Sequence, residues 1–418
     1  MKLVVDGDPD LALRRWAECG ALFLTGAADG PPLADMARVA LWCDALAEQL
    51  KRISSRIGIP VDIDGAALLG ERAAVAGLVR QGATSCGGAS RLLAAADGWI
   101  AVSLARPTDV DLLDAWLGCS LGADEAVPVA DQTWGLVAEI IGTRPARELV
   151  DQAVLLGLAC SILGSAPAST TMVHSHWFEP TPRPKSRLED LLVVDLSALW
   201  AGPLCANLLG LAGARIVKVE STARPDGARF GPPEFYDLLH AGHHSVALDF
   251  AAKAGRDRLL ALLQRADVVI ETSRPRALDA LGVPFEKLHS AGWRGVWISI
   301  TGYGREQPQR VGFGDDAAVA GGLVGRHHDV PVFCADAVAD PLTGLLAAAA
   351  TLHALDLGVC GQFDLSLART AAHLSADVRQ HPVSSLSRGT IAAVPRARSV
   401  IAPASAFGAD TDTVLSEL

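Results

Sequence analysis

The sequence predicts an α/β protein: a doubly wound, mainly parallel sheet domain accompanied by a smaller, mostly helical α+β domain. Short β-rich runs alternate with helical patterns beyond residue 190, which is the pattern of a parallel sheet. Between Trp16 and Leu163, apolar residues recur mainly at three- and four-residue spacing, which is typical of helices. Between these two parts, the stretch Ser165–Arg187 contains four prolines and has the composition of a linker.

Five strands of the sheet are expected in the second half of the chain, with helical patterns between most of them. These strands are Leu191–Leu196, Arg215–Val219, Ser245–Asp249, Asp267–Glu271 and Val296–Ile300. Sheets of this kind bind ligands at the carboxyl ends of their strands. We therefore expect functional residues in the turns that follow these strands.

The remaining elements follow from apolar spacing and from turn composition. In the amino-terminal part, one strand is predicted at Trp99–Leu104, and helices are predicted at Met36–Leu50, Leu112–Leu117 and Trp134–Leu158. After the sheet we expect a helix at Leu342–Leu355, a strand or turn at Val359–Leu367, a connector at His381–Pro403 and a short helix at Thr411–Leu418. We place the domain boundary near Pro182–Lys185, so that residues 1–183 form the smaller domain and residues 184–418 form the sheet domain and tail.

Composition excludes several classes of function. Half of the 418 residues are hydrophobic, so the chain can bury a large core. Its net charge is −11 and it has no long Lys/Arg run, which argues against nucleic acid as a main partner. Apolar stretches such as Gly344–Ala350 are too short to span a membrane, and no secretory signal is visible. We therefore expect a cytoplasmic protein without a membrane partner.

The cysteines and histidines predict no metal site. No two of the eight cysteines are two residues apart, and none has histidines nearby at ligand spacing. Histidine pairs such as His327 and His328 have no Cys or carboxylate partners at the spacing that a metal requires. Reduced, mostly buried thiols and solvated histidines are the simpler interpretation.

A candidate binding turn follows the first predicted strand. It leads through Trp200, Ala201, Gly202 and Pro203 into a helix, whose N-terminus offers free N–H groups to a phosphate or carboxylate. Glu220 follows the second strand, where a dinucleotide-binding fold holds a ribose. The first turn lacks the three-glycine spacing of such folds, so a nicotinamide-dependent oxidoreductase ranks low among the alternatives.

Two other motifs have both a structural and a functional interpretation. Asp340, followed by Pro341, opens the Ala-rich helix, and this pair is an ordinary helix start as well as a candidate catalytic group. The adjacent Gly87 and Gly88 allow a backbone to close over a ligand. Adjacent glycines also occur in ordinary turns, so the residues alone leave both interpretations open.

Ordered motifs are nevertheless spread over about half of the chain. They are Val194–Ser197, Ala201–Pro203, Gly213–Glu220, Ser245–Asp249, Ala266–Glu271, Leu281–Val283, Ile298–Gly304, Gly314–Gly322, the Asp340 segment, Gly361–Leu367 and the tail Phe407–Leu418. In their type and order they resemble the class III CoA-transferases. This family includes formyl-CoA and carnitine-type CoA-transferases and 2-methylacyl-CoA racemases.

The resemblance implies a Rossmann-like, CoA-binding catalytic domain and a covalent mechanism. Asp340 stands at the position of the family's nucleophile, which attacks an acyl-CoA thioester and forms a mixed anhydride and then an aspartyl-CoA thioester. The family covers this intermediate partly with a glycine-rich loop, for which Gly87 and Gly88 are the best counterparts here. The expected reaction moves CoA from an acyl-CoA to a free carboxylic acid. CoA thioester is then a substrate, and no tightly bound cofactor is expected.

The resemblance also implies residues that contact CoA. They are the turn Trp200, Ala201, Gly202 and Pro203, together with Glu220, His243, Thr272, Ser273 and Arg274. Trp200 stands where transferases of the family often carry Gln, and His243, Ser221 and Ala280 replace basic residues expected near the CoA phosphates. The residues proposed to compensate for that lost charge are Arg274, Arg276, His243 and His244.

The order of the parts differs from that of the family. The family's glycine loop follows the nucleophile, whereas Gly87 and Gly88 precede the strand that contains Asp195. The order suggests that the small domain was moved to the amino end, or that a truncated first copy was fused to a second. A faint repeat between Asp29–Pro32 and Asp329–Val332 suits either origin, and alanine richness alone also explains it.

Family members form interlocked dimers, so a homodimer is expected. A non-catalytic CoA-binding or dimer-partner protein is the second hypothesis, favoured by the rearranged order and by the missing basic residues. A racemase needs a histidine just ahead of Asp315, and Val311–Gly314 contains none. Racemisation therefore ranks below transfer.

Overall fold

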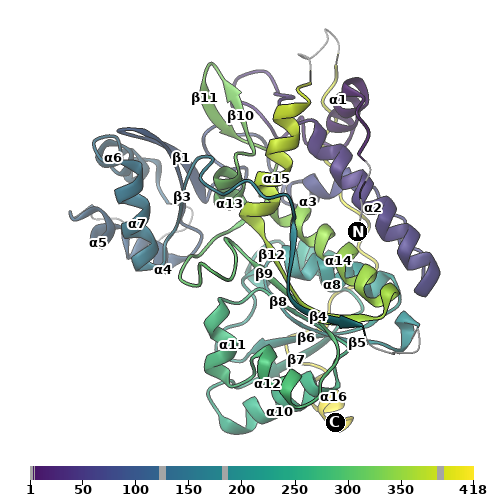
Figure 1. Cartoon of the computed structure of the whole chain (residues 1–418). Coiled ribbons are helices and arrows are strands. Elements are labelled where there is room, and N and C mark those ends of the chain that lie inside the picture. Colours follow the sequence, from purple (N-terminus) through teal and green to yellow (C-terminus); the bar gives the residue numbers. More distant parts are fainter. Residues whose placement is uncertain (1–2, 4, 122–128, 181–186, 384–389) are drawn as a thin grey trace.

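The computed structural model describes residues 3, 5–121, 129–180, 187–383 and 390–418, and its largest element is a seven-stranded sheet (Figure 1). The strand order is β4-β12-β9-β8-β5-β6-β7, and each neighbouring pair is parallel except β4–β12. The strands are β4 (Val173–Pro180), β5 (Leu192–Leu196), β6 (Arg215–Ser221), β7 (His244–Leu248), β8 (Val268–Glu271), β9 (Val296–Thr301) and β12 (Val359–Ser366). The predicted mixed α/β architecture with a mainly parallel sheet is thus confirmed.

Helices cover both faces of this sheet because its central strands are apolar on both sides. Val193 and Val194, neighbours on β5, belong to buried clusters on opposite faces. One face packs against α8 (Ala201–Leu211) and α14 (Ala339–Leu357). The other face packs against α10 (Lys253–Arg265), α11 (Pro275–Leu281), α12 (Phe285–Ser290) and α16 (Thr411–Ser416) (Figure 1).

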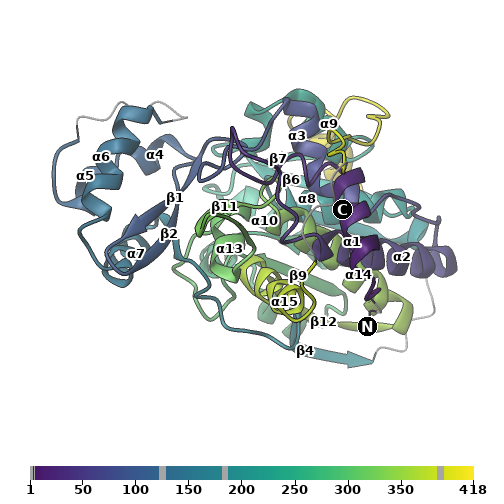
Figure 2. The same ribbon diagram turned by 90° about the horizontal axis from the view of Figure 1, so that it is seen from above.

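The first helices of the chain pack on the sheet domain. Apolar side chains of α1 (Pro9–Glu18), α2 (Arg38–Ile57) and η1 (Ala66–Gly70) share one buried cluster with α8 and α14. Figure 2 shows α1 and α2 beside α14, at the end of the molecule away from the small sheet. The predicted boundary near Pro182–Lys185 falls on residues 181–186, which lie outside the described residues, so the division at residue 183 stays a prediction.

A small antiparallel sheet lies at one side of the molecule (Figure 1). It consists of β1 (Ser90–Ala95), β2 (Gly98–Ser103) and β3 (Ala159–Ile162). Four helices pack with it around a separate apolar cluster: α4 (Pro107–Val110), α5 (Leu113–Leu117), α6 (Asp131–Ile141) and α7 (Ala146–Leu156). The strand predicted at Trp99–Leu104 corresponds to β2. β1 and β3, which lie close to turns, were not predicted from the sequence.

The stretch Ser165–Arg187 is not simply a linker, because it contains β4. This strand pairs with β12 alone, at the edge of the large sheet, and its side chains are half-buried or exposed. Prolines and polar residues around such an edge strand hide it from composition-based prediction. A second missed feature is the hairpin of β10 (Val324–His327) and β11 (Val330–Phe333). The remaining helices are α3 (Glu71–Ala76), α9 (Pro233–His240), α13 (Gly314–Gly321) and α15 (Leu367–Gln380), and short 3₁₀ turns lie at Leu188–Asp190 and Gly227–Phe230.

Candidate active site

Asp340 lies in the first turn of α14, with its carboxylate against the start of α13. A Cβ atom on Gly314 would collide with Oδ2 of Asp340, so the carboxylate touches the Gly314 backbone. Asp340 is partly exposed, whereas Asp316 and Asp336 nearby are fully buried. Asp340 is therefore the least buried of the carboxylates in this region.

Three other aspartates surround Asp340. Asp315 and Asp316 lie at the start of α13, and Asp336 lies in the turn before α14. Burial, together with repulsion between these carboxylates, raises the pKa of Asp340 to about 7 and that of Asp315 to about 7, while Arg72 acts in the opposite direction on both. Burial also raises the pKa of Asp316 to about 6. Part of this acidic cluster is thus protonated at neutral pH.

Asp316 ties the small sheet to the start of α13. Its carboxylate accepts hydrogen bonds from Tyr303 Oη at 2.6 Å, from the Phe313 amide at 2.8 Å and from Ser103 Oγ of β2 at 3.3 Å. Ser161 Oγ of β3 donates to the Asp316 carbonyl oxygen at 2.8 Å. The small sheet therefore holds α13 in the position that brings Gly314 against Asp340.

Arg72 of α3 reaches into the same region. Its Nε and Nη2 atoms lie 2.8 and 2.5 Å from the two carboxylate oxygens of Asp336. Its guanidinium carbon lies 5.3 Å from the centroid of the Trp200 ring, which is a cation–π distance. One guanidinium thus joins the segment before Asp340 to the predicted CoA-binding turn.

The structure also brings the predicted glycine loop to this place. Cys86 Sγ donates to the Ala335 carbonyl oxygen at 3.3 Å, so the loop lies against the turn that leads to Asp340. A Cβ atom on Gly87 would be 3.5 Å from Nη2 of Arg72. Gly88 has φ +78°, a conformation that favours glycine. Gly87 and Gly88 therefore reach the Asp340 segment from a distant part of the same chain.

The turn Trp200, Ala201, Gly202 and Pro203 packs closely against the start of α14. A Cβ atom on Gly344 would be 2.6 Å from the Ala201 carbonyl oxygen, and one on Gly202 would collide with Ser197. Trp200 is buried, and its Nε1 has no hydrogen-bond partner among the described residues. The absence of a side chain at Gly344 thus permits the close approach of this turn to the start of α14.

Two of the predicted CoA contacts are engaged elsewhere. The Glu220 carboxylate pairs with Arg229, at 2.6 Å from Nη2, and accepts a hydrogen bond from the Asp226 amide at 2.8 Å. His243 is buried beside His240, and burial lowers the pKa of His243 to about 3. His243 is therefore neutral at physiological pH and supplies no charge for a phosphate.

Arg274 lies near two other arginines, Arg106 and Arg224, and beside Gly157 at the end of α7. Its guanidinium nitrogens are 3.7 and 3.9 Å from the position of a Cβ on Gly157, whose carbonyl oxygen accepts a hydrogen bond from Arg106 at 3.1 Å. Burial and the nearby positive charges of Arg106 and Arg224 lower the pKa of Arg274. Beside it, Thr272 Oγ1 accepts from the Ala198 amide at 3.0 Å and the Ser273 amide donates to Glu271 at 3.0 Å. Basic residues therefore converge near the predicted CoA site.

Residues 188–415 match the family model described as CoA-transferase family III. This match covers more than half of the chain and includes every motif from the Asp195 strand to α16. The chain belongs to CoA-transferase family III.

Proteins named as acyl-CoA and CoA-transferases resemble this chain over part of their length. An acyl-CoA transferase of Fusarium pseudograminearum is 30% identical over 215 residues, covering 46% of this chain and 47% of that protein. A succinyl-CoA–D-citramalate CoA-transferase of Chloroflexus aurantiacus is 30% identical over 185 residues, covering 41% and 46%. This chain spans about half the length of the curated relatives it matches.

Solved structures also align with part of the chain. A CAIB/BAIF family protein from Brucella suis shares 28% identity and has a TM-score of 0.42, covering 48% of this chain and 56% of that one. A hypothetical protein from Mycobacterium tuberculosis shares 26% identity and has a TM-score of 0.43, covering 46% and 58%.

Several residues near Asp340 in this CoA-transferase family III member were not predicted as site residues. Arg72 and Arg106 lie outside the matched residues 188–415 and belong to no recognisable motif. Asp315 and Asp336 lie inside segments that resemble the family, but neither was predicted to take part in catalysis or binding. A carboxylate flanked by positive-φ alanines, as Asp336 is between Ala335 and Ala337, leaves no signal in the sequence.

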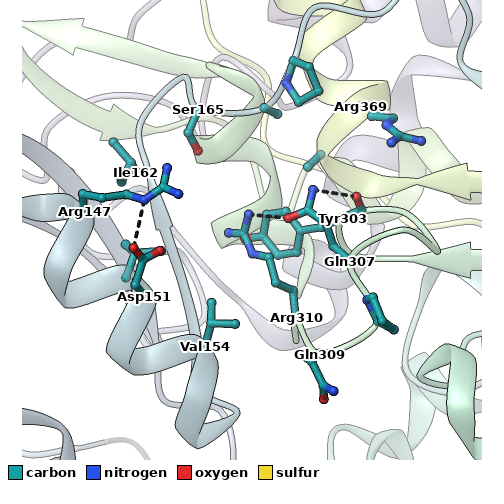
Figure 3. Close-up of a pocket in the computed structure, with 15 residues that line it drawn as sticks. Arg147, Asp151, Val154, Ile162, Ser165, Tyr303, Gln307, Gln309, Arg310 and Arg369 are labelled. Atoms are coloured by element: carbon teal, nitrogen blue, oxygen red, sulfur yellow. Dashed lines mark hydrogen bonds and ion pairs between the residues drawn. The ribbon is translucent and has the colours of Figure 1, made fainter.

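A pocket of about 400 Å³ lies between α7 and the loop after β9 (Figure 3). Arg147, Asp151 and Val154 of α7 face Tyr303 and Arg310 across it. Tyr303 also donates to Asp316, so one wall of the pocket is continuous with the acidic cluster. The pocket is lined by none of the residues predicted for catalysis or CoA binding.

Neither a membrane span nor a metal cluster is found in the part of the chain that the structure describes. No helix there is long and apolar enough to cross a bilayer. No group of three or more His, Cys, Asp or Glu side chains there is arranged to hold a metal ion.

Proposed function

We propose that this CoA-transferase family III member moves CoA from an acyl-CoA thioester to a free carboxylic acid, with Asp340 as the nucleophile. The observation that carries the proposal is the position of Asp340. It is a partly exposed carboxylate near the N-terminus of a long helix, in contact with Gly314 and close to the glycine loop and to the Trp200 turn. The names of its relatives, which include acyl-CoA and succinyl-CoA transferases, support the same class of substrate.

The proposed reaction alternates between two covalent states of Asp340. The carboxylate attacks the thioester carbon, the C–S bond breaks, and CoA leaves as a thiolate. Asp340 is then joined to the donor acyl group in a mixed anhydride. The thiolate then attacks the aspartyl carbon, releasing the donor acid and leaving an aspartyl-CoA thioester. An acceptor carboxylate repeats these two steps in reverse, which regenerates Asp340. Each step is easier than a direct exchange because each joins a good nucleophile to an activated acyl group.

The ionisation of Asp340 controls the first step. Only the carboxylate attacks, and the pKa of about 7 for Asp340 leaves roughly half of it ionised at neutral pH. A carboxylate with a raised pKa is also a stronger nucleophile than an ordinary aspartate. Burial, which raises that pKa, serves the chemistry further by limiting the access of water to the anhydride.

The glycine loop is our proposed cover for the intermediate. The Gly88 amide donates to the Ser85 carbonyl oxygen at 2.8 Å within its own turn, so Gly87 is the better candidate for a donor to the developing oxyanion. Gly87 lies beside Arg72, which places it on the side of the acidic cluster that faces the Trp200 turn.

The arginines near Gly157 are our proposed contacts for the CoA phosphates. Arg224 and Arg274, together with Arg106, whose guanidinium also pairs with the buried Asp109, provide the local positive charge that an acidic protein needs in order to hold an anionic substrate. Arg106 comes from the segment before the matched residues. This grouping replaces the basic positions that His243 and Ala280 do not supply.

The experiment that tests this function is incubation of the purified protein with a panel of acyl-CoA donors and free acids. CoA transfer is measured by chromatography of the CoA esters, and the covalent intermediate is detected by hydroxylamine trapping at Asp340. Asp340→Asn is the matched control, because it keeps the shape and removes the charge. CoA binding without transfer or adduct under all conditions would favour a non-catalytic CoA-binding protein instead.

A further inference from the structure

Arg72 reaches the site from a part of the chain that the family match does not include. It lies on α3, whereas the matched residues are 188–415. Its two bonds to Asp336 are parallel, with 2.8 Å from Nε and 2.5 Å from Nη2, the bidentate geometry in which Arg is hardest to replace. The Asp336 side chain is fully buried and the Arg72 side chain is 31% exposed. The pair thus has one end fixed in the protein and one end open to a ligand.

Arg72 joins the three parts of the site. One edge of its guanidinium binds Asp336, its face lies 5.3 Å from the Trp200 ring centroid, and its Nη2 lies 3.5 Å from the Cβ position of Gly87. These parts belong to the nucleophile segment, to the proposed CoA-binding turn and to the glycine loop. A purely structural ion pair would not need to meet all three.

The turn that carries Asp336 is held in an unusual conformation. Ala335 and Ala337, on either side of Asp336, have φ values of +51° and +42°, in a region that side chains other than glycine seldom adopt. Residues in such conformations persist only where their surroundings enforce them, and they concentrate at functional sites. The turn directs Asp336 toward Arg72. Asp340 comes three residues after Ala337, the last residue of this turn.

Arg72 is itself fixed from the other side. Its neighbour Glu71 is fully buried and accepts two hydrogen bonds from the Arg398 guanidinium, at 2.7 and 3.0 Å. Arg398 also binds Asn207 Oδ1 of α8 at 2.9 Å. The C-terminal tail therefore locks α3 in place, so the position of Arg72 does not depend on Asp336 alone.

Asp340 faces one cation and several anions. The charges of described residues that act on it are Arg72 from α3, Asp315 and Asp316 from α13, and Asp336 from the turn. Arg72 favours the ionised carboxylate and the three aspartates oppose it. A loss of Arg72 would leave Asp340 in a buried group of like charges, where it would hold its proton.

We propose that Arg72 is a positioning residue of this site, which Asp336 holds beside Asp340 so that the nucleophile is ionised and the acyl-CoA meets it in the correct geometry. This inference rests on the proposed function for its role in transfer. The ionisation of Asp340 can be measured without any turnover.

The test is labelling of Asp340 by a water-soluble carbodiimide and an amine between pH 5 and 9, read by peptide mass spectrometry. Carbodiimides react with the protonated carboxyl, so the pH midpoint of labelling reports its ionisation. Arg72→Gln should move this midpoint upward by about one pH unit or more, because it removes the cation. Asp336→Asn should also move it upward, because Arg72 loses the partner that holds it beside Asp340, whereas the loss of one anion alone would move it downward. Arg72→Lys should keep it close to the wild-type value.

The direction of the Asp336→Asn shift separates this role from a simple charge effect. If Asp336 acted only as a nearby anion, Asp336→Asn would move the midpoint downward and overturn the inference. If the ion pair only supported the fold, neither folded variant would move it. Arg38→Gln is the matched control, because Arg38 makes a comparable pair with Asp377 at 2.8 and 3.3 Å outside the site. Its midpoint at Asp340 should equal that of the wild type. Thermal melting of each variant verifies folding, and Asp336→Asn provides the test if Arg72→Gln does not fold.

The steady-state rate of CoA transfer supplies the second readout. The low-pH limb of kcat should move upward in Arg72→Gln and return toward wild type in Arg72→Lys. Unchanged labelling midpoints in both folded variants would overturn the inference even if transfer is observed. Upward midpoint shifts in both variants without any transfer would leave the assignment of Arg72 intact and overturn the proposed function instead.

Discussion

The backbone of Gly314 lies against the carboxylate of Asp340 so closely that a Cβ atom on Gly314 would collide with Oδ2. It would also come within 2.5 Å of the Ala337 carbonyl oxygen. This contact explains why α13 begins with glycine, and it makes Gly314 a sensitive point for the function of Asp340.

Gly314→Ala should therefore displace Asp340 and reduce kcat by about 10²-fold, since a misplacement near 1 Å has such an effect on reacting groups. The measurement is steady-state acyl transfer. Gly135→Ala is the matched control, because Gly135 lies in a helix and its added Cβ meets open space. A Gly314→Ala enzyme as active as the Gly135→Ala enzyme would contradict the placement of Asp340.

The pH dependence of transfer should follow the ionisation of Asp340. Burial and the neighbouring aspartates raise the pKa of Asp340 to about 7, so the reactive carboxylate is scarce below that pH. The single-turnover rate should rise about tenfold per pH unit below the pKa and level off near pH 8. A rate that is flat from pH 5 to 8 would show that the nucleophile has an ordinary aspartate pKa.

The same burial predicts a change of stability with pH at Asp315. Burial raises the pKa of Asp315 to about 7, so between about pH 4 and 7 the folded state holds a proton that the unfolded state has lost. The contribution of Asp315 to stability must therefore fall as pH rises through that range. Asp315→Asn cannot ionise, so it should be more stable than wild type at pH 8 by roughly 1 kcal/mol or more and similar at pH 4.5. Thermal melts of wild type and Asp315→Asn at the two pH values measure this difference in stability. An equal difference at pH 4.5 and pH 8 would contradict the prediction.

The arginines near Gly157 should control the affinity for CoA rather than the chemistry. Arg274→Gln and Arg106→Gln should each raise KM for acyl-CoA by about tenfold, since charge-assisted contacts to phosphate contribute roughly 1.5–3 kcal/mol. The effect should diminish as ionic strength rises. Arg258→Gln, at an exposed position on α10, provides the control. An unchanged KM for acyl-CoA in both arginine variants at low salt would show that the CoA phosphates bind elsewhere.

The presence of Gly87 and Asp340 in one chain gives a prediction for the expected homodimer. Both belong to a site built within a single chain, because Cys86 contacts Ala335 and Gly87 meets Arg72. Mixing inactive Gly88→Val with Asp340→Asn under conditions of subunit exchange should therefore restore no activity. Recovery of a substantial fraction of wild-type activity would mean that the loop acts across an interlocked dimer.

Sequence reasoning predicted the parallel strands better than the edges of the fold. The five strands expected after residue 190 are β5 to β9, because each is a short apolar run between turns and is buried on both faces. β4 was missed, since an edge strand with exposed side chains lacks that signature. The packing of α1 and α2 on the sheet domain was not foreseen either, because apolar spacing defines a helix face and not its partner.

The predictions for the site depended on the resemblance for Asp340 and for the glycine loop. Their proximity follows from contacts between residues about 250 positions apart, such as Cys86 with Ala335, and no local pattern records such contacts. Arg72 and Asp336 are 264 positions apart, and neither has a distinctive neighbourhood in the sequence. His243 shows a further limit of the sequence, which does not record that this histidine is buried and that burial lowers its pKa.

The central claim is that Asp340 forms a covalent bond to the acyl group. It is tested most directly by mixing the protein with a set of acyl-CoA thioesters at pH 8, quenching in acid, and measuring intact mass and peptide maps. With an acceptable donor, wild type should gain the mass of one acyl group or one CoA at Asp340. Asp340→Asn should gain nothing, and its transfer rate should fall by about 10³-fold or more. Sustained transfer by Asp340→Asn, or an adduct at another residue, would contradict the mechanism.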